Sequence, residues 1–185
     1  AGWFAAASGG AAISFPYEHG QIASFTLYAQ WSAVTYTVTY NSNSATSGSP
    51  PSAGSYTTGG SVYTVSANSG TLVRTGYSFA GWNTLVDGSG TTYAAGSGTL
   101  TTSSNFTLYA QWTANTLTVT TDEQGGTAIG NASTTTGGSI ANPGTPTRAG
   151  YTFAGWYAAA SGGSAITFPY THGRTSDFTL FARWT

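Results

Sequence analysis

Alternation of apolar and polar side chains is the clearest local pattern along this chain. In residues 25–31 an apolar side chain stands at every second position, and the same pattern returns at 106–112 and 178–184. A period of two is typical of a strand that has one face in a core and the other toward solvent. We therefore predict a strand at each of these three ranges.

Shorter stretches rich in β-branched and aromatic residues predict further strands. They are residues 36–40, 61–65, 77–82 and 117–121. Residues 41–55 consist mainly of Ser, Asn, Gly and Pro and are predicted to be a loop. The alanine-rich stretch 5–10 is too short for a helix and ends in two glycines, so we predict a loop there as well.

Strict alternation fails at one repeated glycine. Phe153 and Trp156 would fall on opposite faces of a regular strand, although both are large and apolar. A glycine inside a strand often marks a β-bulge, and a bulge at Gly155 would return the tryptophan to the core side. Gly81 and Gly2 stand at the same distance before a tryptophan. We therefore predict the same bulge in each copy of the motif.

The six tryptophans reveal an internal repeat. They fall in pairs separated by 28, 30 and 28 residues, and residues 1–31 align with 154–184 without a gap at 21 identical positions. This spacing divides the chain into a truncated first segment (residues 1–33), a second unit (34–113) and a third unit (114–185). We interpret the chain as part of a longer tandem array.

Composition excludes several classes of function. Only nine residues are charged, all four basic residues are arginine, and the formal net charge is −1. This gives no basic surface for nucleic acid or for an anionic membrane. The chain contains no cysteine, which excludes disulfides and thiol chemistry, and no apolar run approaches the roughly 20 residues of a membrane span.

Candidate catalytic and metal-binding residues are few. His19 and His172 occupy equivalent positions in two copies of the repeat, and His172 with Asp177 is the only local histidine–aspartate pair that a Ser–His–Asp set could use. The simplest interpretation places both histidines in surface loops. Asp122 and Glu123 are adjacent acids without the alternating spacing of a calcium loop. We expect no enzymatic activity, no metal site and no cofactor.

The aromatic residues have two interpretations, as a hydrophobic core or as a platform on which sugars stack. Their alternating strand positions favour the core, since a buried tryptophan can cover up to about 250 Å². The predicted core residues are Trp3, Trp31, Phe79, Trp82, Leu108, Trp112, Phe153, Trp156, Leu180 and Trp184. Tyr28 and Tyr109 fall on the opposite strand face and are the better candidates for a binding surface.

The order of these motifs resembles a known family. A Thr-Val-Thr strand, a Gly-Gly turn, an Arg-x-Gly-Tyr-x-Phe-x-Gly-Trp segment and a closing Thr-Leu-Tyr-Ala-Gln-Trp strand are similar to the Listeria–Bacteroides repeat. This family includes the B repeats of internalin B and occurs in secreted bacterial surface proteins. The resemblance implies tandem β-grasp-like units (ubiquitin- or SUMO-like) of about 70 residues. It also implies an extracellular or cell-surface location and no enzymatic activity.

Two functions are consistent with these features. The first is a structural stalk or fibre, in which each unit contacts only its neighbours and the low charge permits close packing. The alternative is an adhesive module that binds a glycan or a partner protein through exposed aromatic residues.

The first segment lacks the elements equivalent to residues 114–153. One edge of its strand at 25–31 would therefore have no partner, and unpaired edges are rarely left open. We expect this segment to be completed by an adjacent copy or by preceding chain, or else to pack on the second unit.

Overall fold

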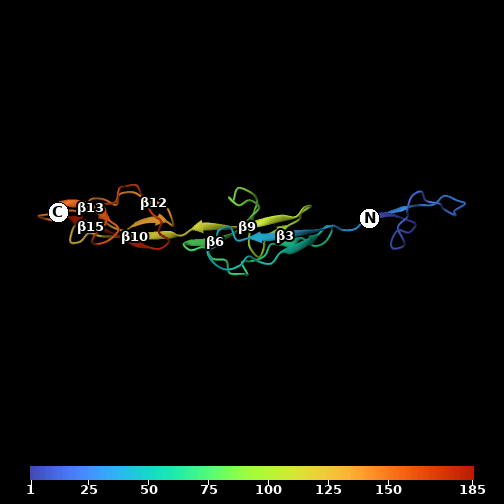
Figure 1. Cartoon of the computed structure of the whole chain (residues 1–185), viewed down its shortest axis with the longest axis horizontal. Helices are drawn as coiled ribbons and strands as arrows, with labels where there is room; N and C mark the ends of the chain where they lie inside the picture. The colour runs from blue at the N-terminus through green and yellow to red at the C-terminus, as the bar shows by residue number, and fades with distance from the viewer.

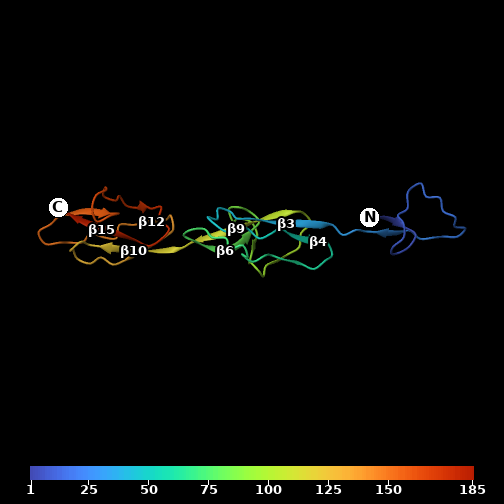
Figure 2. The ribbon, with the colours of Figure 1, turned by 60° about the horizontal axis from the view of Figure 1, so that its bottom comes forward.

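The computed structural model describes residues 1–185 and contains strands, turns and coil without any helix. Its three parts lie in a row along one axis, with the first segment at one end and the C-terminus at the other (Figure 1). The same order is seen after rotation about that axis (Figure 2). The predicted all-β, tandem architecture is confirmed.

Each part has its own strands. The first segment contains β1 (Gly2–Phe4) and β2 (Tyr28–Gln30). The second unit contains β3 (Thr35–Asn41), β4 (Gly54–Thr57), β5 (Tyr63–Thr64), β6 (Tyr77–Asn83), β7 (Thr92–Tyr93), β8 (Thr99–Leu100) and β9 (Phe106–Ala114). The third unit contains β10 (Thr116–Asp122), β11 (Ala132–Thr135), β12 (Ser139–Ile140), β13 (Phe153–Tyr157), β14 (Tyr170–Thr171) and β15 (Phe178–Trp184).

The two complete units share one sheet topology. The strand order is β4-β3-β9-β6-β7 in the second unit and β11-β10-β15-β13 in the third. The first and last long strands of each unit, β3 with β9 and β10 with β15, are parallel neighbours, and the other pairs are antiparallel. A parallel pair needs a long crossover connection. Here the chain between the parallel strands passes through the other strands of the sheet and through coil that carries the short pairs β5–β8 and β12–β14.

Each complete unit has a small core on one face of its sheet. Trp82 and Trp156 are 0% and 1% exposed, and Leu108 and Leu180 are fully buried. In both units a half-buried phenylalanine packs edge-on between two indole rings, with centroid distances of 5.3–5.7 Å. These triads are Phe79 with Trp82 and Trp112, and Phe153 with Trp156 and Trp184. The outer tryptophans, at 112 and 184, are half-buried.

The predicted bulge is confirmed in both complete units. The β6–β9 register shifts between Phe79 and Gly81, and the β13–β15 register shifts between Phe153 and Gly155. Both glycines have a positive φ, 121° and 126°, which is difficult for other residues. The extra residue places each phenylalanine on the same face as the tryptophan that follows it.

The first segment requires a correction to the predicted core. β1 and β2 pair as their counterparts in the third unit do, with Trp3 opposite Ala29. Trp3 is nevertheless 48% exposed and Trp31 is 86% exposed. Residues 1–33 do not include counterparts of the elements that cover Trp156 in the third unit. Nor does this segment pack on the second unit, from which a thin connection separates it (Figure 1).

The sequence did not predict the short strands β7, β8, β12 and β14, nor the four-residue strands β4 and β11. β4 and β11 pair with the first long strand of their units, although their sequences, GSYT and ASTT, contain mostly small polar residues. The predicted strand at 61–65 is reduced to β5, and the strand predicted at 25–31 is reduced to β2.

Candidate inter-unit interface

The second and third units are joined by a single residue. β9 ends at Ala114 and β10 begins at Thr116, so only Asn115 separates the two strands. β6 pairs with β9 up to its last residue, with Tyr77 opposite Ala114. The hydrogen-bonded sheet of the second unit therefore continues to the boundary of the third.

The carbonyl of Gly76 is the centre of this joint, which we define as Gly76, Asn115, Thr136 and Thr175. It accepts hydrogen bonds from the Asn115 N–H at 2.9 Å and from the Thr136 hydroxyl at 2.6 Å. The Asn115 carbonyl in turn accepts from the Thr136 N–H at 2.9 Å. A backbone group of the second unit is thus bonded to both the connecting residue and a side chain of the third.

Close packing at the joint requires a glycine. Gly76 has a φ of +81°, and a Cβ atom there would lie 2.8 Å from Thr136 Cγ2 and from Thr175 Cβ. Contacts this short are not tolerated, so a side chain at this position would push the third unit away. Thr136 itself is buried, with 7% of its surface exposed. The two units therefore meet through direct contact as well as through the chain.

A stacked turn presents Gly76 to the third unit. In this Gly76 turn (residues 74–77) the Tyr77 N–H donates to the Arg74 carbonyl at 2.9 Å. The Arg74 guanidinium lies 4.0 Å from the centre of the Tyr77 ring, in cation–π geometry. The Tyr77 hydroxyl points toward Gly137, a Cβ on which would lie 3.9 Å away. The turn is held by its own side chains and does not need an ion pair.

Four of the predicted core tryptophans also fasten loops. Each indole N–H in the complete units donates a hydrogen bond of 2.7–2.9 Å to a loop carbonyl. The pairs are Trp82 with Ser66, Trp112 with Asn43, Trp156 with Gly144 and Trp184 with Glu123. Because these loops carry the crossovers, the indoles hold in place chain that forms no regular strand.

A second repeated contact fastens the glycine-rich loop after β1 and β13. Gln30 donates to the carbonyls of Ala6 and Gly9 at 3.0 and 2.9 Å. Arg183, at the equivalent position, donates to the carbonyls of Ala159 and Gly162. Different side chains at one position thus hold the same loop in the first segment and the third unit.

Tyr28 and Tyr109 do not form a common binding surface. Tyr28 is 40% exposed on β2, whereas Tyr109 is half-buried at the centre of the second sheet. The loop after β6 lies near this face, since Gln111 and Asn43 donate to the carbonyls of Leu85 and Val86. The two tyrosines belong to separate parts of the chain.

His172 does not lie on the surface as predicted, because it is only 3% exposed. Its Nδ1 accepts from the Arg174 N–H at 3.2 Å, and its Nε2 lies 3.2 Å from the Thr134 hydroxyl, which itself donates to the Ser139 carbonyl. This pattern fits a neutral ring with the proton on Nε2. Burial, and then the charge of Arg174, lower the pKa of His172 below its ordinary value. His19 is exposed.

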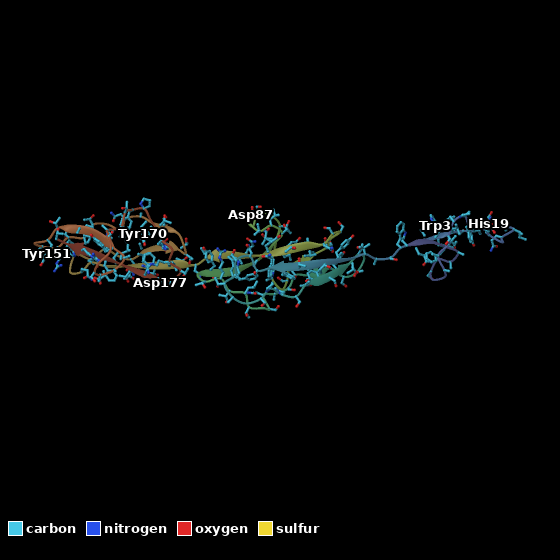
Figure 3. The ribbon with its side chains drawn as sticks, viewed as in Figure 1. Trp3, His19, Asp87, Tyr151, Tyr170 and Asp177 are labelled. Carbon is cyan, nitrogen blue, oxygen red and sulfur yellow. The ribbon has the colours of Figure 1, made fainter.

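The acidic residues hold backbone in place. Asp177 accepts from the Thr118 N–H at 2.8 Å and does not bond to His172. Asp122 accepts from the N–H and the side-chain amide of Gln124, and Glu123 accepts from the Ile129 N–H at 2.8 Å. The structure contains no cluster of three or more His, Cys, Asp or Glu side chains that could hold a metal ion. Figure 3 shows Asp177 near the joint and Asp87 on a loop of the second unit.

Sequence reasoning identified the Arg-x-Gly-Tyr motif but not the joint that it forms. Two repeated patterns in the sequence could have pointed to the joint. The Arg-x-Gly-Tyr motif of Gly76 recurs around Gly150, and Thr-Thr-Gly-Gly occurs at both 57–60 and 135–138. Gly76 and Thr136 are 60 residues apart in the chain, and only the structure shows that they are in contact.

The structure contains no helix with the length and apolar character of a membrane span.

Comparison with known proteins places these features in a wider group. The profile of the Listeria-Bacteroides repeat domain matches residues 36–111 and 118–183. A Gly-rich membrane protein of Evansella cellulosilytica is 35% identical over 162 residues, which cover 86% of this chain and 18% of that protein. A second membrane protein of that bacterium is 46% identical over 90 residues, covering 49% of this chain and 13% of its own length.

A further relative comes from another bacterium. Internalin H of Listeria monocytogenes is 34% identical over 112 residues, which cover 60% of this chain and 20% of that protein. The chain thus spans a fifth or less of the length of each of these relatives. The two profile matches together include most of the sequence and coincide with the two complete sheets. The chain belongs to the Listeria–Bacteroides repeat family.

Proposed function

We propose that this chain is a non-enzymatic spacer, in which tandem units are held in line to keep other parts of a bacterial surface protein apart. The observation that carries this proposal is the joint between the second and third units. With a single connecting residue and a carbonyl bonded from two sides, the joint leaves little freedom for one unit to rotate against the other. A spacer needs this property, because a flexible connection would not hold a fixed separation.

Two further features support a surface location. The relatives include an internalin and two proteins described as membrane proteins, of which this chain matches only a part. The chain has no cysteine and therefore no thiol that could be oxidised. It also has no lysine, so trypsin-type proteases could cut it only at its four arginines. We accordingly place the chain outside the cell, on or near the bacterial surface.

The test measures the joint directly. Because the chain has no cysteine, spin labels can be attached at two introduced positions, Ser97→Cys and Ser161→Cys, which are exposed in the second and third units. We expect pulsed electron paramagnetic resonance to give one narrow distance distribution. Gly76→Ala should broaden it, because the new methyl group would contact Thr136 and Thr175.

Gly150→Ala is the matched control. Gly150 has a φ of +80°, so alanine there bears the same backbone strain, roughly 1–2 kcal/mol, but contacts no neighbouring unit. It should leave the distribution between the labels narrow. A broad distribution in the unmodified chain, or equal effects of the two variants, would show that the units are not held in line.

The adhesive alternative has less support in the arrangement of side chains. Its two candidate tyrosines lie in different parts of the chain, and Tyr109 is half-buried. Binding on a glycan array that is lost in Tyr28→Ala would revive it.

Self-assembly into fibres is an extension of the spacer proposal. It rests on the exposure of Trp3 and Trp31 and on the edge of β2, which within residues 1–33 pairs only with β1. Sedimentation velocity at increasing concentration checks it: assembly requires a sedimentation coefficient that rises with concentration and falls again in Trp31→Ser.

We also infer that each complete unit is a helix-free variant of the β-grasp class, with boundaries at 33/34 and 113/114. The inference is supported by the parallel first and last strands at the centre of each mixed sheet. Chains 34–185 and 114–185 should then each unfold in a cooperative transition. A chain cut inside a unit, for example 45–185, should lose the second unit's transition.

A further inference from the structure

We propose that the turn at residues 148–151, the Gly150 turn, is a preformed docking surface for another repeat unit, placed directly after Thr185. The partner would be recognised by two donors, the N–H of a connecting residue equivalent to Asn115 and the hydroxyl of a threonine equivalent to Thr136. This inference rests on the proposed spacer function and names the contact by which the array is extended.

The Gly150 turn has the same geometry as the Gly76 turn. The Tyr151 N–H donates to the Arg148 carbonyl at 3.1 Å, as Tyr77 donates to Arg74 at 2.9 Å. The guanidinium-to-ring distance is 4.0 Å in both turns. The two glycines have φ angles of 81° and 80°. The carbonyl that accepts two hydrogen bonds at the joint therefore has a counterpart of the same conformation at residue 150.

What differs between the turns is the partner. A Cβ at Gly76 would meet Thr136 and Thr175 at 2.8 Å, whereas a Cβ at Gly150 would meet no atom within 4 Å. Tyr151 is 53% exposed, while Tyr77 is half-buried against the third unit. Figure 3 shows Tyr151 at the far end of the third unit. An open hollow of about 650 Å³, lined in part by Arg148, Tyr151 and Trp184, borders the turn.

The second unit has its own counterpart of Thr136, the threonine that donates a hydrogen bond to the Gly76 turn. Thr58 occupies the position of Thr136, and its N–H donates to the Val34 carbonyl as that of Thr136 donates to Asn115. Residues 1–33 begin after the position equivalent to this turn, and in this structure the Thr58 hydroxyl donates to the Val34 carbonyl at 3.1 Å. The threonine hydroxyl thus bonds to the neighbouring unit at Thr136, where the structure holds a turn beside it, and to its own unit at Thr58.

The backbone at the end of the third unit is already in register for such a partner. Thr152 and Thr185 exchange two backbone hydrogen bonds of 2.8 and 2.9 Å. The equivalent residues Ser78 and Thr113 are paired in the second unit, and only Ala114 separates Thr113 from Asn115. The second residue after Thr185, equivalent to Asn115, would therefore lie where its N–H can reach the Gly150 carbonyl.

The experiment extends the chain by one unit. A second copy of residues 114–185 is fused after Thr185, so that the junction reads Trp-Thr-Ala-Asn-Thr as it does at 112–116. Spin labels at Ser161→Cys in the third unit and in the added copy report the new joint. We expect a distance distribution as narrow as that between the second and third units, and broadening in Gly150→Ala.

A second variant keeps the test valid if Gly150→Ala disturbs the third unit itself. Replacement of the threonine equivalent to Thr136 by valine, in the added copy alone, removes one donor and leaves the third unit unchanged. It should broaden the same distribution.

A broad distribution in the unmodified extended chain, or one that neither variant changes, would overturn the inference. The labels between the second and third units, measured in the same extended chain, separate this failure from failure of the spacer function. If that older joint stays narrow while the new one is broad, only the proposed docking surface is wrong.

Discussion

At the scale of single residues, each tryptophan of the complete units combines burial with a hydrogen bond. The ring of Trp156 is buried against Phe153, and its N–H holds the loop at Gly144. Removing such a side chain therefore removes core volume and releases a loop together. In this structure Trp3 and Trp31 donate no hydrogen bond, and residues 1–33 do not include counterparts of the loops that accept from Trp156 and Trp184.

Trp156→Ala should unfold the third unit. Truncation of a buried aromatic side chain costs about 3–5 kcal/mol, and a unit of this size is stable by only about 5 kcal/mol. Trp31→Ala, at a site that is 86% exposed, should change the free energy of unfolding by less than about 0.5 kcal/mol. Urea denaturation followed by fluorescence measures both, and equal effects would refute the core assignment.

Burial of His172 predicts a pH dependence. The pKa of His172 is lowered in the folded state, so the unfolded chain binds the proton first as the pH falls through about 6.5. The free energy of unfolding should therefore decrease on acidification from pH 7.5 to 5.5. Thermal melts across this range measure the effect. His172→Gln should flatten the dependence and His19→Gln should leave it unchanged; a dependence that survives His172→Gln would assign it to another group.

At the scale of elements, the sequence predicted those strands whose two faces differ in polarity. β9 and β15 fall where alternation was clear, and β3, β6 and β10 fall where β-branched and aromatic residues are concentrated. The bulges follow from the spacing of one glycine before a tryptophan. β4 and β11 could not be found this way, because only Tyr56 and Thr134 of their side chains are buried. Pairing with a neighbouring strand, and not side-chain pattern, stabilises them.

The bulge itself can be tested at Gly155. Its φ of 126° is accessible mainly to glycine, and a Cβ there would lie 3.3 Å from Ala165 Cβ. Gly155→Ala should destabilise the third unit by about 1–3 kcal/mol. Gly173→Ala is the control, since a Cβ at Gly173 meets no atom within 4 Å and its φ is not positive. Calorimetry measures the melting temperature of both variants. An unchanged melting temperature in Gly155→Ala would show that the bulge does not require a glycine.

At the scale of the whole molecule, the repeat predicted a row of units but not how they are held. The alignment of residues 1–31 with 154–184 shows that units recur, whereas the bond from Thr136 to Gly76 depends on two motifs meeting in space. The exposure of Trp31 is a finding of the same kind. Its sequence environment is that of a core residue, but residues 1–33 include no strand that covers it, and it is 86% exposed.

Parallel pairing of the first and last long strands has a mechanical consequence. When the two ends of a complete unit are pulled apart, β3 is drawn one way and β9 the other, so their ladder from Val38–Phe106 to Asn41–Tyr109 is loaded in shear. All of its hydrogen bonds must then fail together, as must those between β10 and β15. β1 and β2 are antiparallel, with Gly2 opposite Gln30, so pulling would separate them by breaking their hydrogen bonds one after another.

Stretching the chain between residues 1 and 185 by single-molecule force spectroscopy should therefore give one weak event from the first segment and two strong events of similar force. The connection between the two complete units is the single residue Asn115, which can extend very little. Tension should therefore pass directly from one unit to the next. A row of such units would transmit tension from end to end while each unit yields only in shear.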